Sequence, residues 1–272
     1  MPRCKYCKQP TASWFARAHP ECESTHKKGL EEIRSRLHRA LFESYQLEDL
    51  EIAETRAQQS FVSTEEISEI VAELFPKALN KALEDHVLTE AEILVLHKAT
   101  QLLTEKTYER IAPAINTLKK ATILAYLQEG RLPNVSIQGS IPFILQKGEQ
   151  PVWVEENVPL YEYKTERSYV SSGFGISVRI AKGVYLRPSQ HQVRQVVTKE
   201  FIKQTDRGLL LFTNKNIYFG GAKLRRIPLN KVMGLRLFKD GVEVPMDGTK
   251  SKPLVFGVSD PVFIANLINA LQ

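Results

Sequence analysis

The chain has 272 residues, of which 43% are hydrophobic and 25% are charged, a balance typical of a folded globular protein. No apolar stretch approaches the length that spans a bilayer, and the first residues lack the hydrophobic segment of a secretory signal. We therefore expect a cytoplasmic protein without a transmembrane segment. The net charge of +6 is uneven, because residues 1–40 carry +5, residues 41–130 carry −8 and residues 131–272 carry +9. Basic ends suit an acidic partner, which can be nucleic acid, an anionic membrane surface or a protein.

All three cysteines lie near the N-terminus, in the order Cys4-x2-Cys7, a loop of eleven residues, then His19-x2-Cys22. Zinc prefers four tetrahedral ligands drawn from thiolates and imidazoles, and two close pairs joined by a loop supply them. Four protein ligands would leave no position for the water of a catalytic zinc. The sequence therefore predicts a structural zinc site of the CCHC type, with the ligands Cys4, Cys7, His19 and Cys22.

A finger over residues 1–26 is too short to bury a core, so metal binding would supply its folding free energy. Trp14 and Phe15 lie in the loop between the ligand pairs and are expected to form a small apolar plug. His26 is an alternative ligand to His19. Two other interpretations remain, namely ordinary reduced cysteines and a disulfide, and the odd number of cysteines disfavours the disulfide.

Residues 27–130 show the hydrophobic periodicity of helices, and we predict a small helical bundle. Its first element is expected to be one long helix over residues 27–59, since no proline interrupts that stretch. Capping boxes at Ser63–Glu66 and Thr89–Glu92 predict the starts of two further helices. The basic side chains of the long helix form either a solvated face or a nucleic-acid contact; they are Arg34, Arg36, His38 and Arg39.

The last helix of the bundle is expected over residues 105–127, bent or restarted at Pro113. Between the two capping boxes, Asp85-His86-Val87-Leu88-Thr89 precedes a capped helix and resembles the loop-plus-helix of tellurite-resistance-type helical domains. This segment lacks the evenly spaced acidic ligands of a calcium loop, so we predict no metal there.

From residue 140 the pattern changes to short β-strands, and we predict an antiparallel β-barrel plugged by a C-terminal helix. Asp260 is expected to cap that helix and Pro261 to occupy its first position. A glycine-rich stretch, Ser171 to Gly175, is expected to form a hairpin tip. Strands are expected at 151–154, 158–163, 176–180, 184–187, 193–202, 208–213, 216–219, 224–229, 232–238, 242–244 and 254–256.

The segment from Gly208 to Phe219 reads GLLLFTNKNIYF, and the segment from Ile227 to Val232 reads IPLNKV. The first is similar to the G-x-L-x-x-T-N-x-x-I-x-F pattern of bacterial pleckstrin-homology-like and GRAM-type domains. The second is similar to the I-P-L-x-K-I strand entry of that family. The resemblance covers residues 200–272 directly and residues 140–199 only by implication.

This resemblance implies binding of a lipid headgroup or a protein rather than catalysis. In lipid-binding members, basic side chains on loops at the open end of the barrel hold phosphates. The alternative is a solvated basic edge that discourages pairing between strands of different molecules. The candidate anion-binding residues of this chain are Lys215, Lys223, Arg225 and Arg226.

Together these patterns predict a multidomain α+β protein, with a zinc finger at 1–26, a helical bundle at 27–130 and a pleckstrin-homology-like β domain at 140–272. The sequence has no nucleophile elbow, Walker motif or zinc-protease helix, so we predict that it is not an enzyme. We expect a binding or adaptor protein that engages a protein or a membrane surface. The alternative is a nucleic-acid-binding regulator, with the finger and the basic helix on phosphates.

Overall fold

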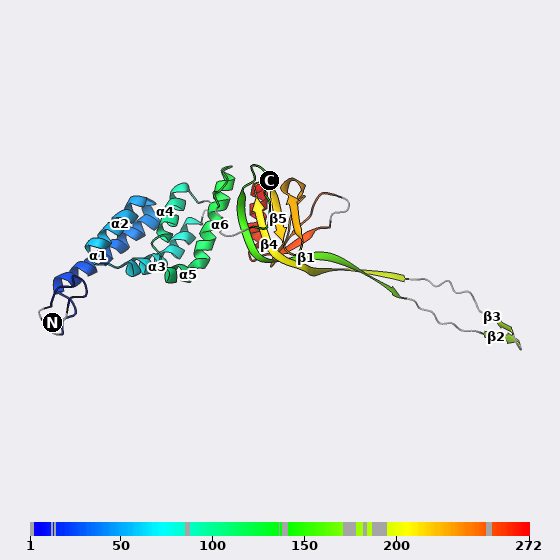
Figure 1. The fold of residues 1–272 in the computed structure, drawn as a ribbon, viewed down its shortest axis with the longest axis horizontal. Helices are drawn as coiled ribbons and strands as arrows, with labels where there is room; N and C mark the ends of the chain where they lie inside the picture. The colour runs from blue at the N-terminus through cyan, green and yellow to red at the C-terminus, as the bar shows by residue number, and fades with distance from the viewer. Residues whose placement is uncertain are drawn as a thin grey trace. The chain divides into compact units, whose positions relative to one another are not determined.

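The computed structural model describes residues 3–11, 13, 15–84, 88–135, 137, 141–170, 178–181, 184–186, 195–248 and 252–272. The chain divides into two compact units, Met1–Pro133 and Asn134–Gln272. The first is built from helices, and the second from strands with one helix (Figure 1). The chain is therefore a mixed α and β protein, as predicted. No helix in the described part is both long and apolar enough to cross a membrane.

Local sequence signals set most helix boundaries of the first unit. The capping box at Ser63 is confirmed, because Ser63 Oγ accepts from Glu66 N at 3.2 Å and Glu66 Oε2 accepts from Ser63 N at 2.9 Å. The box at Thr89–Glu92 is present as well. The helical elements are α1 Pro20–Arg39, the π-helical turn η1 Ala40–Ser44, α2 Leu47–Gln59, α3 Thr64–Ala82, α4 Glu90–Thr100, α5 Glu105–Arg110 and α6 Ala112–Gln128.

The single long helix predicted over residues 27–59 is wrong. The chain turns back after η1 at Tyr45, whose φ of 49° is left-handed, and continues as α2. The turn is fixed by the Asp49 carboxylate, which is 1% exposed and accepts from Arg39 Nη2 at 2.6 Å and from Ser44 Oγ at 2.9 Å. Folding back also lets both helices bury their apolar faces against the rest of the bundle, which one straight helix could not do.

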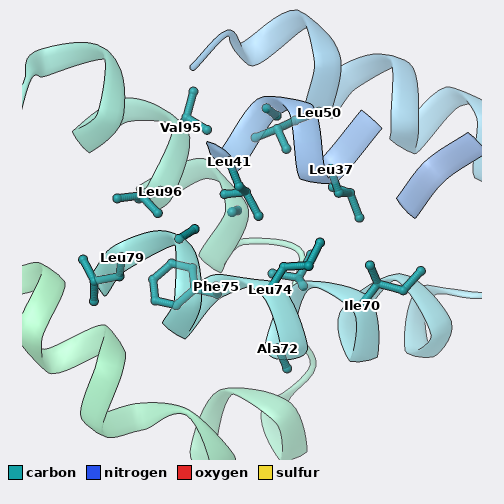
Figure 2. Packing of buried hydrophobic residues seen from close by; sticks show 14 of the residues in the cluster. Leu37, Leu41, Leu50, Ile70, Ala72, Leu74, Phe75, Leu79, Val95 and Leu96 are labelled. Atoms are coloured by element: carbon teal, nitrogen blue, oxygen red, sulfur yellow. The ribbon is translucent and has the colours of Figure 1, made fainter. Parts of the chain in front are cut away.

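The core of the bundle lies between these two helices and α3 and α4. Figure 2 shows Leu41, Phe75 and Leu96 converging from η1, α3 and α4, and all three are fully buried. Their burial removes large apolar side chains from water, which is the main favourable contribution to folding.

The restart at Pro113 is confirmed, because α5 ends at Arg110 and Pro113 lies in the first turn of α6. A proline there costs no helical hydrogen bond. Of the segment that resembles tellurite-resistance-type domains, Asp85, His86 and Val87 lie outside the described residues.

The second unit contains one seven-stranded antiparallel sheet in its described part, in the order β6-β5-β4-β1-β9-β8-β7, and a separate β2–β3 pair. The sheet is open, with β6 and β7 as its edges, rather than the closed barrel that the sequence predicts. The strands are β1 Pro151–Val170, β2 Val178–Ala181, β3 Val184–Leu186, β4 Gln195–Thr213, β5 Asn216–Gly220, β6 Leu224–Pro228, β7 Arg236–Phe238, β8 Gly241–Val244 and β9 Leu254–Gly257.

Strands β1 and β4 are much longer than the others. The two strands predicted at 151–154 and 158–163 are one strand, β1, with a bulge between Glu155 and Val158 where Asn157 has a φ of 56°. Strand β9 pairs with β1 only from Leu160 to Glu162. Beyond that point β1 and β4 pair only with each other among the described strands and continue as a two-stranded ribbon (Figure 1). The predicted hairpin tip at 171–175 lies outside the described residues.

Helix α7, Pro261–Leu271, packs on β7 and β8 and covers the apolar face of the sheet. Its predicted cap is confirmed, because Asp260 Oδ1 accepts from Phe263 N at 3.0 Å. The ring of Phe263 meets Trp153 edge to face at 5.0 Å between centroids. Beneath the helix, Phe219 and Phe256 pack at 5.8 Å and fill the centre of the core.

Gly29 is a site where an added side chain would collide with a neighbour. A Cβ there would lie far inside van der Waals contact of the Ser60 side chain, which closes the end of α2. We predict that Gly29→Ala lowers the free energy of unfolding by about 1–2 kcal/mol, because the overlap outweighs the helix propensity that alanine gains. Urea unfolding followed by circular dichroism at 222 nm measures it.

The matched control is the double variant Gly29→Ala with Ser60→Gly, which removes the side chain that the new methyl group would meet. This variant should recover most of the stability that Gly29→Ala loses. Equal loss in the single and double variants would show that the close contact with Ser60 is not the cause.

Candidate functional site

Two short backbone structures present the predicted metal ligands. Cys4 and Cys7 flank a turn closed by hydrogen bonds from Cys4 N to Gln9 O at 2.8 Å and from Lys8 N to Cys4 O at 3.0 Å. His19 is the residue before α1, and Cys22 lies in the first turn of that helix. The first pair therefore comes from a turn and the second from a helix start.

The structure brings these four side chains together. Their ligand atoms all lie within 4.8 Å of one another, and Cys7 Sγ is 3.2 Å and Cys22 Sγ 3.8 Å from His19 Nδ1. Tetrahedral zinc bonds of about 2.3 Å to sulfur place ligand atoms about 3.8 Å apart, so the cluster has the dimensions of such a site. All three cysteines are free, and Cys4 is fully buried. The cluster could therefore hold a metal ion.

A backbone carbonyl orients the imidazole of the cluster. His19 Nε2 lies 3.0 Å from the carbonyl oxygen of Pro10. A carbonyl oxygen can only accept, so Nε2 carries the proton and the lone pair of Nδ1 points toward the sulfur atoms. Metal-binding histidines are commonly fixed by a second hydrogen bond of this kind.

The thiols influence one another's ionisation. Burial raises the pKa of Cys4, but hydrogen bonds from the backbone N–H groups of Cys7 and His19 outweigh it and lower that pKa to about 6. Burial and the neighbouring Cys7 and Cys4 sulfur atoms raise the pKa of Cys22 to about 11. Crowded thiols cannot all ionise alone, whereas a bound cation would stabilise every thiolate.

Two predicted features near this cluster are corrected by the structure. Phe15 is 96% exposed and is no part of an apolar plug, and Trp14 lies outside the described residues. The alternative ligand His26 is engaged elsewhere, because its Nε2 lies 3.0 Å from Glu66 Oε1 and its ring packs on Tyr6 at 4.7 Å between centroids. The Tyr6 ring also contacts Phe61, at 5.9 Å.

The four basic side chains predicted as a possible nucleic-acid contact on α1 lie beside acidic partners within the bundle. Arg34 pairs with Glu73 at 2.7 Å, and Arg36 and Arg39 both bind Asp49, at 3.0 and 2.6 Å. Arg39 is the main cause of the lowered pKa of Asp49. His38 lies 3.3 Å from Glu43.

The structure does not bring the four basic residues predicted on the sheet together at one pocket, although Arg225 and Arg226 line one pocket between them. Arg225 binds Glu162 at 2.6 Å, while Arg226, the next residue along β6, points to the opposite face. Lys223 is exposed in the β5–β6 turn. Lys215 and Arg226 line one pocket of about 470 Å³, of which neither Lys223 nor Arg225 is part.

Sequence reasoning missed the buried carboxylate of Glu149, which is 7% exposed. It accepts hydrogen bonds from Thr213 Oγ1 at 2.6 Å, Asn216 Nδ2 at 2.8 Å and Tyr218 OH at 2.9 Å, and from the backbone N of Gln146 at 2.7 Å. Burial raises its pKa, but these hydrogen bonds outweigh burial and lower it.

The network explains the motif at the β4–β5 turn. Asn214 Oδ1 accepts from Gln150 N at 2.9 Å, and Lys215 Nζ donates to Lys147 O at 2.8 Å. Together with the bonds to Glu149, these contacts tie the turn to the segment before β1. No local signal marks Glu149 for this role, because its side-chain partners lie more than 60 residues further along the chain.

Comparisons of the chain with protein-family models, with curated proteins and with solved structures find no match.

We predict that Glu149→Gln lowers the free energy of unfolding of the sheet unit by about 1–3 kcal/mol at pH 7, because the amide presents an N–H₂ group to donors. A carboxyl whose pKa is lowered by folding stabilises above its ordinary pKa, and this stabilisation is lost as the pH falls through the folded pKa. The difference between variant and parent should therefore shrink below about pH 4.

Fluorescence of Trp153, which packs on α7, reports unfolding of this unit when Trp14 is replaced by phenylalanine. The control is Glu156→Gln, since Glu156 is an exposed acid on the same strand as Trp153. A difference between Glu149→Gln and its parent that stays constant down to pH 3 would contradict the assigned charge of Glu149.

Proposed function

We propose that this protein is a non-enzymatic adaptor, in which a structural zinc module is joined to a helical bundle and a pleckstrin-homology-like domain carries out recognition. The observation that carries the proposal is the convergence of Cys4, Cys7, His19 and Cys22 on one point. Three thiols and one oriented imidazole form a donor set that suits zinc, and the four together fill a tetrahedral shell. Zinc bound there would stabilise the fold rather than activate water.

The arrangement of the first unit supports a structural role for the metal. In the segment before α1, the ring of Tyr6 contacts the bundle at His26 and Phe61. Zinc bound by the four ligands would stabilise the folded conformation of this segment. In turn, α1 would carry the ligands His19 and Cys22 rigidly into the bundle.

Topology supports the pleckstrin-homology-like interpretation of the second unit. In the seven-stranded sheet, β1 lies in the middle, between β4, the second of these strands in chain order, and β9, the last. An antiparallel meander that curls back until its last strand meets its first, and that is interrupted between β6 and β7, has this order. A C-terminal helix then covers the inner face. The motif residues Thr213 and Asn216 also hold the β4–β5 turn against Glu149.

Ion pairing argues against the arginines of α1 as the recognition surface. The arginines of α1 that would contact phosphates in a nucleic-acid-binding regulator are paired with Glu73 and Asp49. The free energy needed to break those ion pairs would offset much of the binding free energy that phosphate contacts provide. The sheet unit instead displays exposed Lys215 and Arg226 at one pocket.

For the metal, we predict about one zinc ion per purified chain by elemental analysis. Cys7→Ser should reduce the zinc content well below one ion per chain, because a required ligand is lost. It should also lower the free energy of unfolding of the helical first unit. The matched control is His26→Asn, which removes an imidazole that binds Glu66 and should leave the zinc content unchanged.

Zinc retained by Cys7→Ser, or lost from His26→Asn but kept by His19→Asn, would refute this ligand assignment.

For the adaptor function, we predict that the tagged full chain captures a partner from a native lysate after nuclease treatment, or sediments with anionic vesicles. Binding to generic duplex DNA should be weak at physiological salt. A nucleic-acid-binding regulator would instead bind DNA with an affinity that falls steeply as salt rises. If nuclease treatment abolished capture of the partner, and DNA binding weakened steeply as salt rose, the protein would be a nucleic-acid-binding regulator rather than an adaptor.

A further inference from the structure

The two-stranded ribbon of β1 and β4 has no strand partner on either outer edge among the described strands. Strand β9 pairs with β1 only from Leu160 to Glu162, and β5 pairs with β4 only from Leu209 to Phe212. Beyond these ladders β1 and β4 pair with each other as far as Val170 and Gln195 (Figure 1). An unpaired edge presents a row of backbone N–H and C=O groups, which favours the addition of another strand.

The ribbon also exposes apolar side chains where it leaves the sheet. Phe201 and Ile202 of β4 are 43% and 44% exposed, and neighbouring residues of a strand point to opposite faces. Each face of the ribbon therefore shows a large apolar side chain to solvent. A pair of strands alone is only marginally stable in water, whereas three or more strands support one another. Pairing with a further strand would therefore stabilise the ribbon.

The order of charges along β4 argues against pairing of its edge with the same edge of a second copy. In a symmetric antiparallel pair, opposed residues share one face of the sheet, so even-numbered positions face even-numbered positions. Between residues 195 and 204, the cations Lys199 and Lys203 have odd numbers, whereas the acid Glu200 has an even number. No register of two β4 edges over this range places opposite charges across from each other.

The free part of β1 carries the complementary pattern. Lys164 and Glu166 both have even numbers, with Thr165 between them. A two-fold axis at Thr165 therefore places position 164 of each copy opposite position 166 of the other, so two pairs of opposite charge form. Moving the axis to position 164 or 166 would instead set two like charges directly opposite each other, which is destabilising.

The register within one ribbon leaves Lys164 able to make this contact. Lys164 stands opposite Phe201 across the ribbon, whereas Glu166 stands opposite Lys199. Lys164 Nζ lies 3.2 Å from Glu162 Oε2 of its own strand, and an ammonium has three donors, so that contact does not exhaust it. In a paired sheet, each row of charged positions would run from 199 to 166 of one copy and on to 164 of the other, with alternating sign.

We propose that the chain self-associates through the free edge of β1, by antiparallel pairing of the β1 strands of two copies about Thr165. Two ribbons would then form one four-stranded sheet. Backbone hydrogen bonds hold the pair together, and the two symmetric contacts between Lys164 and Glu166 set its register. This inference goes beyond the adaptor function and does not depend on it.

Sedimentation velocity of the full chain over a dilution series tests the proposal, and we expect an equilibrium between monomer and dimer. Lys164→Glu and Glu166→Lys should each raise the dissociation constant of the dimer about tenfold or more, because each replaces two attractive contacts by two repulsive ones. The control Lys239→Glu makes the same change of charge in the exposed turn between β7 and β8, and it should change the constant less than about twofold.

An equimolar mixture of the two single variants is the decisive measurement. In a mixed dimer, positions 164 and 166 are both glutamate in one copy and both lysine in the other, so each cross-strand pair is again of opposite charge. The mixture should therefore recover most of the affinity that each variant alone loses, which also shows that both variants are folded. A parent chain that stays monomeric throughout the series, single variants that dimerise as the parent does, or a mixture that stays monomeric would overturn the inference.

Discussion

Four donor side chains meet at one point, and the start of the first unit depends on that meeting. Cys4 and Cys7 come from a turn, whereas His19 and Cys22 belong to the start of α1. Because α1 runs on into the bundle core, the cluster fixes the direction in which the helix leaves the turn. The nearby Phe15 is 96% exposed and adds no buried apolar side chain to this segment. A metal ion held by the four side chains would add coordination bonds to the contacts of this segment.

Features with local causes could be predicted from the sequence. The caps at Ser63 and Asp260 and the restart at Pro113 depend on hydrogen bonds or steric limits within a few residues. The proximity of the two ligand pairs was also predictable, because metal chemistry restricts the spacing. The mixed α and β class followed from the change of hydrophobic period near residue 140.

Features with distant causes could not be predicted. The turn at Tyr45 contains no glycine or proline, and it depends on Asp49 finding Arg39 and Arg36 on the preceding helix. The openness of the sheet depends on how far each ladder extends, which the strand patterns do not encode. Glu149 looked like any loop acid, although it anchors the motif that carries the family resemblance. Phe15 looked like core by type alone, and its exposure depends on where the loop runs.

The ribbon formed by β1 and β4 has a consequence for motion in the second unit. Its register runs from Tyr161 to Val170 without a bulge, while the irregularities of β1 all lie at or before the step from Leu160 to Tyr161. The hydrogen bonds of a continuous ladder resist sliding of β1 past β4, so a pull or twist on the outer end of the ribbon is transmitted to the sheet. The ribbon joins the sheet at the segment Leu160–Glu162, where β9 also pairs with β1. Displacement of the arm would therefore strain the centre of the sheet rather than its rim.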